Sequence, residues 1–199
     1  MNKKGAFIVV EGLDGSGKTT QAKLLTARLS RSRRAVYTQE PSNGNIGAFI
    51  RNHVLYGANR VPTVVEALLF AADRIDHVQN EVQPALNLGM VVVSDRYVYS
   101  SLAYQGSAGL SLDWIETING HALKPDLALF IDVAPEVVLQ RLKRRKSVME
   151  NLETQRKVRE IYQKFVEKGE LVRIDGGKPK SNVAEEVFAA VTKFLKTRG

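Results

Sequence analysis

The chain has 199 residues, of which 44% are hydrophobic and 25% are charged, and these values are typical of a globular domain with one buried core. It contains no cysteine, which excludes disulfides, thiolate metal sites and cysteine nucleophiles. The net charge of +8 favours polyanionic ligands, either nucleotides or nucleic acid. From the length we expect one domain over residues 1–199, and the absence of cysteine fits the cytoplasm. No apolar run approaches the roughly 18 residues that a membrane span needs, so we expect no membrane partner.

A glycine-rich motif follows the first predicted strand. Residues 6–10 form an apolar, β-branched run typical of a buried parallel strand, and residues 20–29 have helical spacing. Between them, Gly12-Leu13-Asp14-Gly15-Ser16-Gly17-Lys18-Thr19 fits the pattern G-x-x-x-x-G-K-[ST], the phosphate-binding loop or P-loop. Its backbone N–H groups would cradle phosphate oxygens at a helix N-terminus, where Lys18 would contact the β- and γ-phosphates and Thr19 would bind Mg²⁺. We therefore assign this motif, together with Thr20, to the binding of ATP with Mg²⁺.

The remaining chain alternates predicted strands and helices. Further apolar strands are expected at residues 35–38, 90–94, 127–133 and 171–175. Helices are expected at residues 46–55, 64–82, 98–104, 112–123, 153–168 and 182–195, and Pro135 suits the first turn of another. Near-continuous apolar strands separated by helices predict an α/β protein with a three-layer, doubly wound, five-stranded parallel sheet of the P-loop kinase type. Ligands of such sheets bind at the carboxyl ends of the strands.

The longest predicted helix, at residues 64–82, has one apolar face. That face consists of residues at a spacing of three and four, namely Val64, Leu68, Ala71, Ile75, Val78 and Val82. Residues on or near the opposite side are Phe70, Asp73, Arg74 and His77. Pro84 should either kink the last turns of this helix or start a new one.

Polar residues close the second and third strands. Gln39-Glu40-Pro41 follows the second strand, and Asp95-Arg96-Tyr97 follows the third. A carboxylate at a strand end beside a P-loop commonly holds Mg²⁺, directly or through water, and Asp95 is the best candidate. Its structural alternative is a helix N-cap. Arg96 has a planar guanidinium that matches phosphate oxygens.

A basic cluster, formed by Arg141, Lys143, Arg144, Arg145 and Lys146, interrupts a helical stretch. It could be the solvated face of a long helix. We favour a lid over residues 141–152 whose arginines close over ATP, and which of them reaches inward stays open. Nucleic-acid binding is a third possibility, but no aromatic residues interleave the cluster to stack bases, so we expect no nucleic-acid partner.

The histidines of the chain, at positions 53, 77 and 121, are scattered and show no metal-binding spacing. We interpret them as structural or surface residues.

Together these residues resemble the thymidylate kinase family, P-loop enzymes that phosphorylate dTMP from ATP. The resemblance covers nearly the whole chain, which makes it more specific than the P-loop alone. It is carried by residues 7–20, Glu40-Pro41, residues 69–74, Asp95-Arg96-Tyr97, residues 103–106, Pro125-Asp126-Leu127, Ile131-Asp132-Val133 and Pro135-Glu136.

The resemblance implies roles around the acceptor nucleotide. Asp14 would accept a hydrogen bond from the sugar 3′-hydroxyl, Phe70 would stack on thymine, and Tyr104 would crowd the sugar 2′ position. Arg74 would hydrogen-bond the base and stack on it, with Ser101 nearby, and Arg96 would lie beside the acceptor phosphate. The implied acceptor site comprises Asp14, Glu40, Arg51, Phe70, Arg74, Arg96, Ser101, Tyr104 and Gln105.

The resemblance also implies a homodimer and a set of catalytic cations, namely Lys18, Arg96, Arg144 and Arg145. Two positions depart from the family pattern. Gln39 stands where members often have arginine before Glu-Pro, and Arg51 is the candidate to compensate. The lid lacks the Asp-Arg pair common after its basic start. The uncharged Gly15 resembles the subgroup that takes its catalytic arginine from the lid, which gives Arg144 and Arg145 more weight.

Two alternatives to a dTMP kinase stay open. A deoxynucleoside kinase would also have a P-loop and an acidic residue after the second strand, and Glu40 would then act as general base on a 5′-hydroxyl. A nucleotide-dependent switch or NTPase would bind or hydrolyse ATP without any dependence on dTMP.

Overall fold

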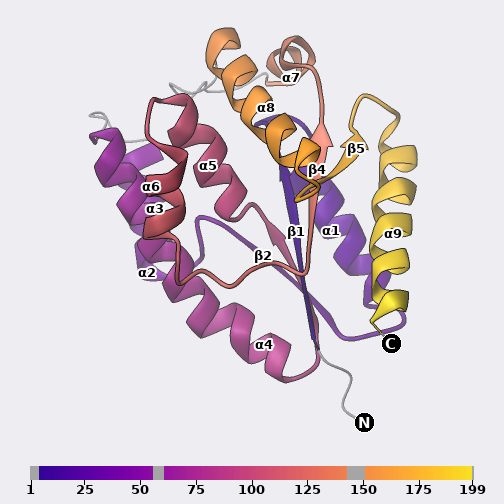
Figure 1. The fold of residues 1–199 in the computed structure, drawn as a ribbon. Coiled ribbons are helices and arrows are strands. Elements are labelled where there is room, and N and C mark those ends of the chain that lie inside the picture. Colours follow the sequence, from indigo (N-terminus) through magenta and orange to yellow (C-terminus); the bar gives the residue numbers. More distant parts are fainter. Residues whose placement is uncertain (1–4, 56–60, 143–150, 199) are drawn as a thin grey trace.

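The structure is a computed structural model that describes residues 5–55, 61–142 and 151–198 (Figure 1). Its centre is a sheet of five strands in the order β2-β3-β1-β4-β5, in which all pairings are parallel. The strands are β1 (Ala6–Gly12), β2 (Ala35–Gln39), β3 (Val91–Asp95), β4 (Leu127–Asp132) and β5 (Val172–Asp175). The fold class predicted from the sequence is confirmed.

Helices cover both faces of the sheet, which is why the central strands are apolar on both sides. On one face lie α1 (Lys18–Leu29) and α9 (Lys180–Thr197), side by side in Figure 1. The other face carries α5 (Val98–Ser107) and α8 (Leu152–Glu167), with α3 (Thr63–His77), α4 (Gln83–Asn87) and α6 (Leu112–Ile118) around them. Shorter segments are α2 (Asn45–Phe49), α7 (Pro135–Arg141) and two π-helical turns, η1 (Ile50–Leu55) and η2 (Val78–Val82).

The long helix predicted at residues 64–82 corresponds to α3 and the π-helical turn η2, and α4 follows η2 directly. Pro84 lies in the first turn of α4, so the second of the two expectations for this proline holds. The helix predicted at 112–123 is shorter than expected and ends at Ile118. Asn119 follows it, and its side chain donates to the carbonyl of Ile115 at 2.8 Å.

The apolar face of α3 is only partly covered, which the sequence pattern did not indicate. Val64 and Leu68 are 44% and 47% exposed, whereas the polar residues Asp73, Arg74 and His77 are buried. The polar side of α3 turns toward the carboxyl ends of the strands, where other polar groups satisfy it. Among the described residues, no helix is long and apolar enough to cross a bilayer.

Candidate functional site

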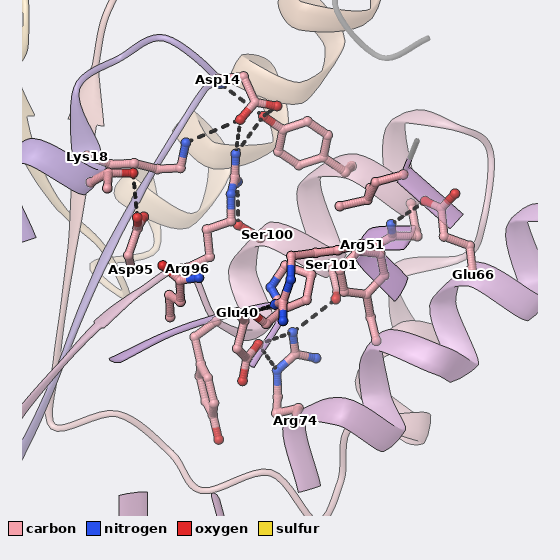
Figure 2. Close-up of a pocket in the computed structure, with 18 of the residues that line it drawn as sticks. Asp14, Lys18, Glu40, Arg51, Glu66, Arg74, Asp95, Arg96, Ser100 and Ser101 are labelled. Atoms are coloured by element: carbon pink, nitrogen blue, oxygen red, sulfur yellow. Dashed lines mark hydrogen bonds and ion pairs between the residues drawn. The ribbon is translucent and has the colours of Figure 1, made fainter. Parts of the chain in front are cut away.

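The carboxyl ends of β1, β2 and β3 border a cavity of about 540 Å³ (Figure 2). The parallel register places Asp95 beside Val10 on one side and beside Gln39 on the other, so the three strand ends meet. Many of the predicted site residues line this cavity: Asp14, Gly15, Lys18, Thr19, Glu40, Arg51, Phe70, Arg74, Asp95, Arg96, Ser101, Tyr104 and Gln105. The other P-loop residues, Gly12, Leu13, Ser16, Gly17 and Thr20, are not among its described lining.

The P-loop has the backbone that phosphate binding needs. Gly12 has φ +155°, and a Cβ there would lie 2.6 Å from Ser16 Oγ and 2.9 Å from the Ile131 carbonyl oxygen. Gly17 has φ +93° and directly precedes α1, whose first turn is capped by no side chain of the described part of the chain. The N–H groups of that turn are therefore available to an anion, and Gly12 and Gly17 would contribute through the backbone.

Lys18 is buried at the start of α1. Its Nζ lies 3.3 Å from both the Leu13 carbonyl oxygen and Asp14 Oδ1. Burial and the neighbouring charge of Arg96 lower the pKa of Lys18, while Asp14 and Asp95 act in the opposite direction. A phosphate group at this position would favour the protonated form, so binding of ATP and the charge of Lys18 support each other.

Arg96 and Asp14 form an ion pair at the same end of the cavity (Figure 2). Arg96 has φ 74°, unusual for a residue with a side chain, and its N–H donates to the Val10 carbonyl at 3.0 Å. Its guanidinium donates to Asp14 and, at 2.9 Å, to Ser100 Oγ. Burial acts to raise the pKa of Asp14, but the charges of Arg96 and Lys18 outweigh it and hold that pKa below its usual value.

Tyr104 completes this end of the cavity. Its hydroxyl donates to Asp14 Oδ2 at 3.3 Å and accepts the Asp14 N–H at 3.2 Å. The two side chains predicted to face the acceptor sugar, Asp14 and Tyr104, are therefore in mutual contact and fix each other's position.

Thr19 and Asp95 form a fitting pair of oxygen ligands for Mg²⁺. Thr19 Oγ1 donates to Asp95 Oδ2 at 2.5 Å. The other carboxylate oxygen, Oδ1, is buried and has no hydrogen-bond partner among the described residues. The described chain contains no group of three His, Cys, Asp or Glu side chains that could hold a metal alone. A pair of this kind suits Mg²⁺, which commonly binds one or two protein ligands together with substrate phosphates and water.

Arg74 and Glu40 form a buried ion pair at the opposite end of the cavity (Figure 2). Arg74, only 1% exposed, donates from Nε and Nη2 to Glu40 Oε2 at 3.0 and 2.7 Å. It also donates to Asn119 Oδ1 at 2.5 Å and to Ser101 Oγ at 3.2 Å. Sequence reasoning missed Asn119, because a single asparagine after a helix gives no signal of a distant partner.

Arg51, the candidate to compensate for the arginine absent at position 39, lies beside the Glu40-Pro41 turn. Gln39 Oε1 accepts a hydrogen bond from the Tyr37 hydroxyl at 2.9 Å. Arg51 lines the cavity, with Nη1 donating to the carbonyls of Pro41 and Ser42 at 2.8 and 2.6 Å. The structure therefore places a cation beside this turn, although from η1 and not from β2.

Gln105 and Phe70 form another part of the wall. Gln105 Nε2 donates to Glu66 Oε1 at 2.8 Å, which links α5 to α3. Phe70 is partly buried and lines the cavity, as a ring that stacks on a base would. Glu66 also lines the cavity and was not predicted.

Glu11 is a further residue that sequence reasoning missed. Its buried carboxylate accepts hydrogen bonds from the Tyr97 N–H at 2.8 Å, Ser100 Oγ at 2.6 Å and the Tyr162 hydroxyl at 2.9 Å. Burial raises the pKa of Glu11, although these donors counteract the shift. Ser100 also contacts Arg96, so Glu11 is linked to that arginine through the Ser100 hydroxyl. A carboxylate inside an apolar strand, directly before the P-loop, was the available signal.

The predicted lid arginines, Arg144 and Arg145, lie outside the described residues, and their roles stay predictions. On either side of them, α7 ends at Arg141 and α8 begins at Leu152. Leu142, just after α7, lines the cavity.

A parallel sheet with a P-loop after its first strand, and a charged cavity at the carboxyl ends of its strands, is the arrangement of a P-loop kinase. Residues 10–187 match the model of the family described as thymidylate kinase, and the chain belongs to that family of ATP-dependent nucleoside monophosphate kinases.

Several curated proteins are similar over most of their length. A probable thymidylate kinase of Pyrococcus abyssi is 43% identical over 198 residues, which cover 96% of this chain and 97% of that protein. A probable thymidylate kinase of Pyrobaculum calidifontis is 41% identical over 95% of this chain and 97% of its own length. A probable thymidylate kinase of Methanococcus vannielii is 46% identical over 84% of this chain and 79% of its own length.

Proposed function

We propose that this chain transfers the γ-phosphoryl group of ATP to the phosphate of dTMP and produces dTDP. The observation that carries the proposal is that one cavity joins the P-loop end, with Lys18 and Arg96, to the end that contains Arg74 and Glu40. A donor phosphate on the loop and an acceptor base near Arg74 would then face each other across the same space.

The acceptor needs no general base. A nucleoside monophosphate is mostly dianionic at neutral pH, since its second pKa is about 6, so its phosphate oxygen is already a nucleophile. Catalysis then depends on positioning and on neutralising the negative charge that gathers between the two phosphates. Lys18 and Arg96 would supply the positive charge, and both form ion pairs with the Oδ1 oxygen of Asp14.

Mg²⁺, held by Thr19 and Asp95, would neutralise charge on the donor phosphates when bound. Oδ1 of Asp95 is buried and has no hydrogen-bond partner among the described residues, which supports this assignment. Asp95 is also not the N-cap of the following helix, because α5 begins at Val98 and its N-cap is Tyr97. The P-loop residues from Gly12 to Thr20 would hold those phosphates.

At the acceptor end, Arg74 would hydrogen-bond the thymine base and Phe70 would stack on it, with Ser101 beside them. The contacts of Arg74 with Glu40, Asn119 and Ser101 fix the guanidinium before any base arrives, which lowers the entropy lost on binding. Asp14 and Tyr104 would meet the sugar, Gln105 and Arg51 would complete the wall, and Arg96 would contact the acceptor phosphate.

The contacts of Glu40 speak against a deoxynucleoside kinase. One of its oxygens accepts two N–H groups of Arg74, and the other lies 3.2 Å from Nδ1 of His77. A general base needs a free oxygen directed at the hydroxyl that it deprotonates. Glu40 is better suited to hold Arg74.

We also propose that the enzyme is a homodimer. Exposed apolar side chains gather on the adjoining helices α2 and α3, namely Phe49, Val64, Val65 and Leu68. An exposed apolar cluster of this kind is typical of a protein interface. Cytoplasmic location and the lid over residues 141–152 stay predictions.

An ATP-coupled assay across nucleoside monophosphates and thymidine tests the proposed function. We expect dTMP to be the best acceptor. Faster turnover of thymidine would support the deoxynucleoside kinase, and ATP hydrolysis that does not depend on any acceptor would support a switch or NTPase. Comparison of dTMP with dUMP in the same assay measures how strictly the thymine methyl group is read.

A further inference from the structure

His77 was expected to be a structural or surface residue, but it occupies an unusual position. It is the last residue of α3 and only 1% exposed, yet it is not part of the described lining of the cavity. Its ring lies between Thr38, near the end of β2, and Glu40, which follows that strand. Nε2 is 2.6 Å from Thr38 Oγ1, and Nδ1 is 3.2 Å from Glu40 Oε1.

The partners of the ring determine which nitrogen carries a proton. A carboxylate oxygen only accepts hydrogen bonds, so Nδ1 must be the donor toward Glu40. Thr38 can donate its single hydroxyl hydrogen either to Nε2 or to Glu81 Oε2, which is 3.0 Å away. Glu81 Oε2 is also 3.7 Å from Nε2. In each of these arrangements His77 keeps an N–H directed at Glu40.

The two oxygens of Glu40 have separate tasks. Oε2 accepts both N–H groups of Arg74, and Oε1 faces His77. A carboxylate held at one oxygen only can rotate about its terminal bond, which has broad torsional freedom. The hydrogen bond from His77 removes that freedom, and the fixed carboxylate in turn fixes the guanidinium of Arg74 against Ser101 in the cavity wall.

We propose that His77 is a positioning residue for the acceptor nucleotide, acting through Glu40 and Arg74. It touches no substrate, and its contribution is the orientation of the arginine that meets the base. This inference rests on the proposed function, which assigns the Arg74 end of the cavity to the acceptor.

Two substitutions of similar size separate positioning from a merely structural role. In His77→Asn the amide nitrogen takes nearly the place of Nδ1, so the donor to Glu40 is kept and the contact with Thr38 is lost. In His77→Gln the amide reaches the place of Nε2, so the contact with Thr38 is kept and the donor to Glu40 is lost. Both variants lose one buried hydrogen bond, which makes each the control for the other.

The experiment measures kcat, the KM for each substrate and the melting temperature for the wild type and both variants. We expect His77→Gln to raise the KM for dTMP about tenfold, since a hydrogen bond to a charged group has that order of effect. The KM for dTMP of His77→Asn should stay within about twofold of the wild type, and both variants should keep the KM for ATP.

Equal rises of the KM for dTMP in both variants, or a rise that follows the melting temperature, would overturn the inference, as would an unchanged KM in His77→Gln. The comparison uses whichever nucleoside monophosphate the wild type turns over best. If that is not dTMP, the proposed acceptor is wrong, while the difference between the two variants still tests His77.

Discussion

The ion pair of Glu40 and Arg74 can be tested by a double-mutant cycle. The single variants are Glu40→Gln and Arg74→Met, and the third is the double variant. Both side chains are almost fully buried, with exposed fractions of 5% and 1%, and their shortest N–O distance is 2.7 Å. Each substitution nearly conserves volume, so the measured effects report mainly on charge and hydrogen bonding.

The magnitude follows from burial. Removing one partner of a buried ion pair leaves an uncompensated charge, which costs about 3–5 kcal/mol of folding free energy. Glu40→Gln should fall at the lower end, because a glutamine carbonyl can still accept from Arg74. The double variant leaves neither charge behind, so its loss should be smaller than the sum of the single losses by about 2 kcal/mol.

Urea denaturation at neutral pH gives the free energies of unfolding, and steady-state kinetics give the KM for each substrate. We expect Arg74→Met to raise the KM for dTMP at least about tenfold, with the KM for ATP nearly unchanged. Stabilities that add within about 0.5 kcal/mol would show that the two charges are not coupled. Equal rises of both KM values would remove Arg74 from the acceptor site, and a loss of kcat by orders of magnitude in Glu40→Gln would reinstate Glu40 as a general base.

Three further predictions concern other parts of the molecule. Lys18→Ala should lower kcat about a thousandfold without unfolding the protein, and turnover like the wild type in a coupled assay would refute its role. Burial acts to raise the pKa of Asp132, but hydrogen bonds from Arg159 and Arg173 outweigh it and lower that pKa. The ionised Asp132 therefore stabilises the folded protein above the pKa of an unfolded aspartate, about 3.9, and this stabilisation is lost as the pH falls. Asp132→Asn should therefore destabilise the protein by about 1–2 kcal/mol at pH 7 and by progressively less below about pH 4, measured by denaturation across pH; a difference that does not change with pH would contradict this. Leu68→Glu should convert a dimer to a monomer in sedimentation experiments, and an unchanged mass would exclude this face as the interface.

The sequence by itself determined the class of fold and the position of the P-loop within it. Buried parallel strands have apolar runs that are recognisable locally, and a P-loop needs glycines at fixed positions because other residues cannot adopt its backbone. Asp95 could also be placed beside the loop, because parallel strands end at one edge of the sheet. These features depend on short segments and on a general rule of topology.

Only the tertiary structure decided which side chains contact one another at the Arg74 end of the cavity. Arg74, Glu40 and Asn119 come from three distant segments, and no local pattern shows that their side chains meet. The hydrophobic pattern of residues 64–82 identified an apolar face, but Val64 and Leu68 on that face are exposed, whereas Arg74 and His77 on the polar side are buried. Buried charged and polar groups are stable only where partners from elsewhere in the chain satisfy them, and the position of those partners is a property of the whole fold.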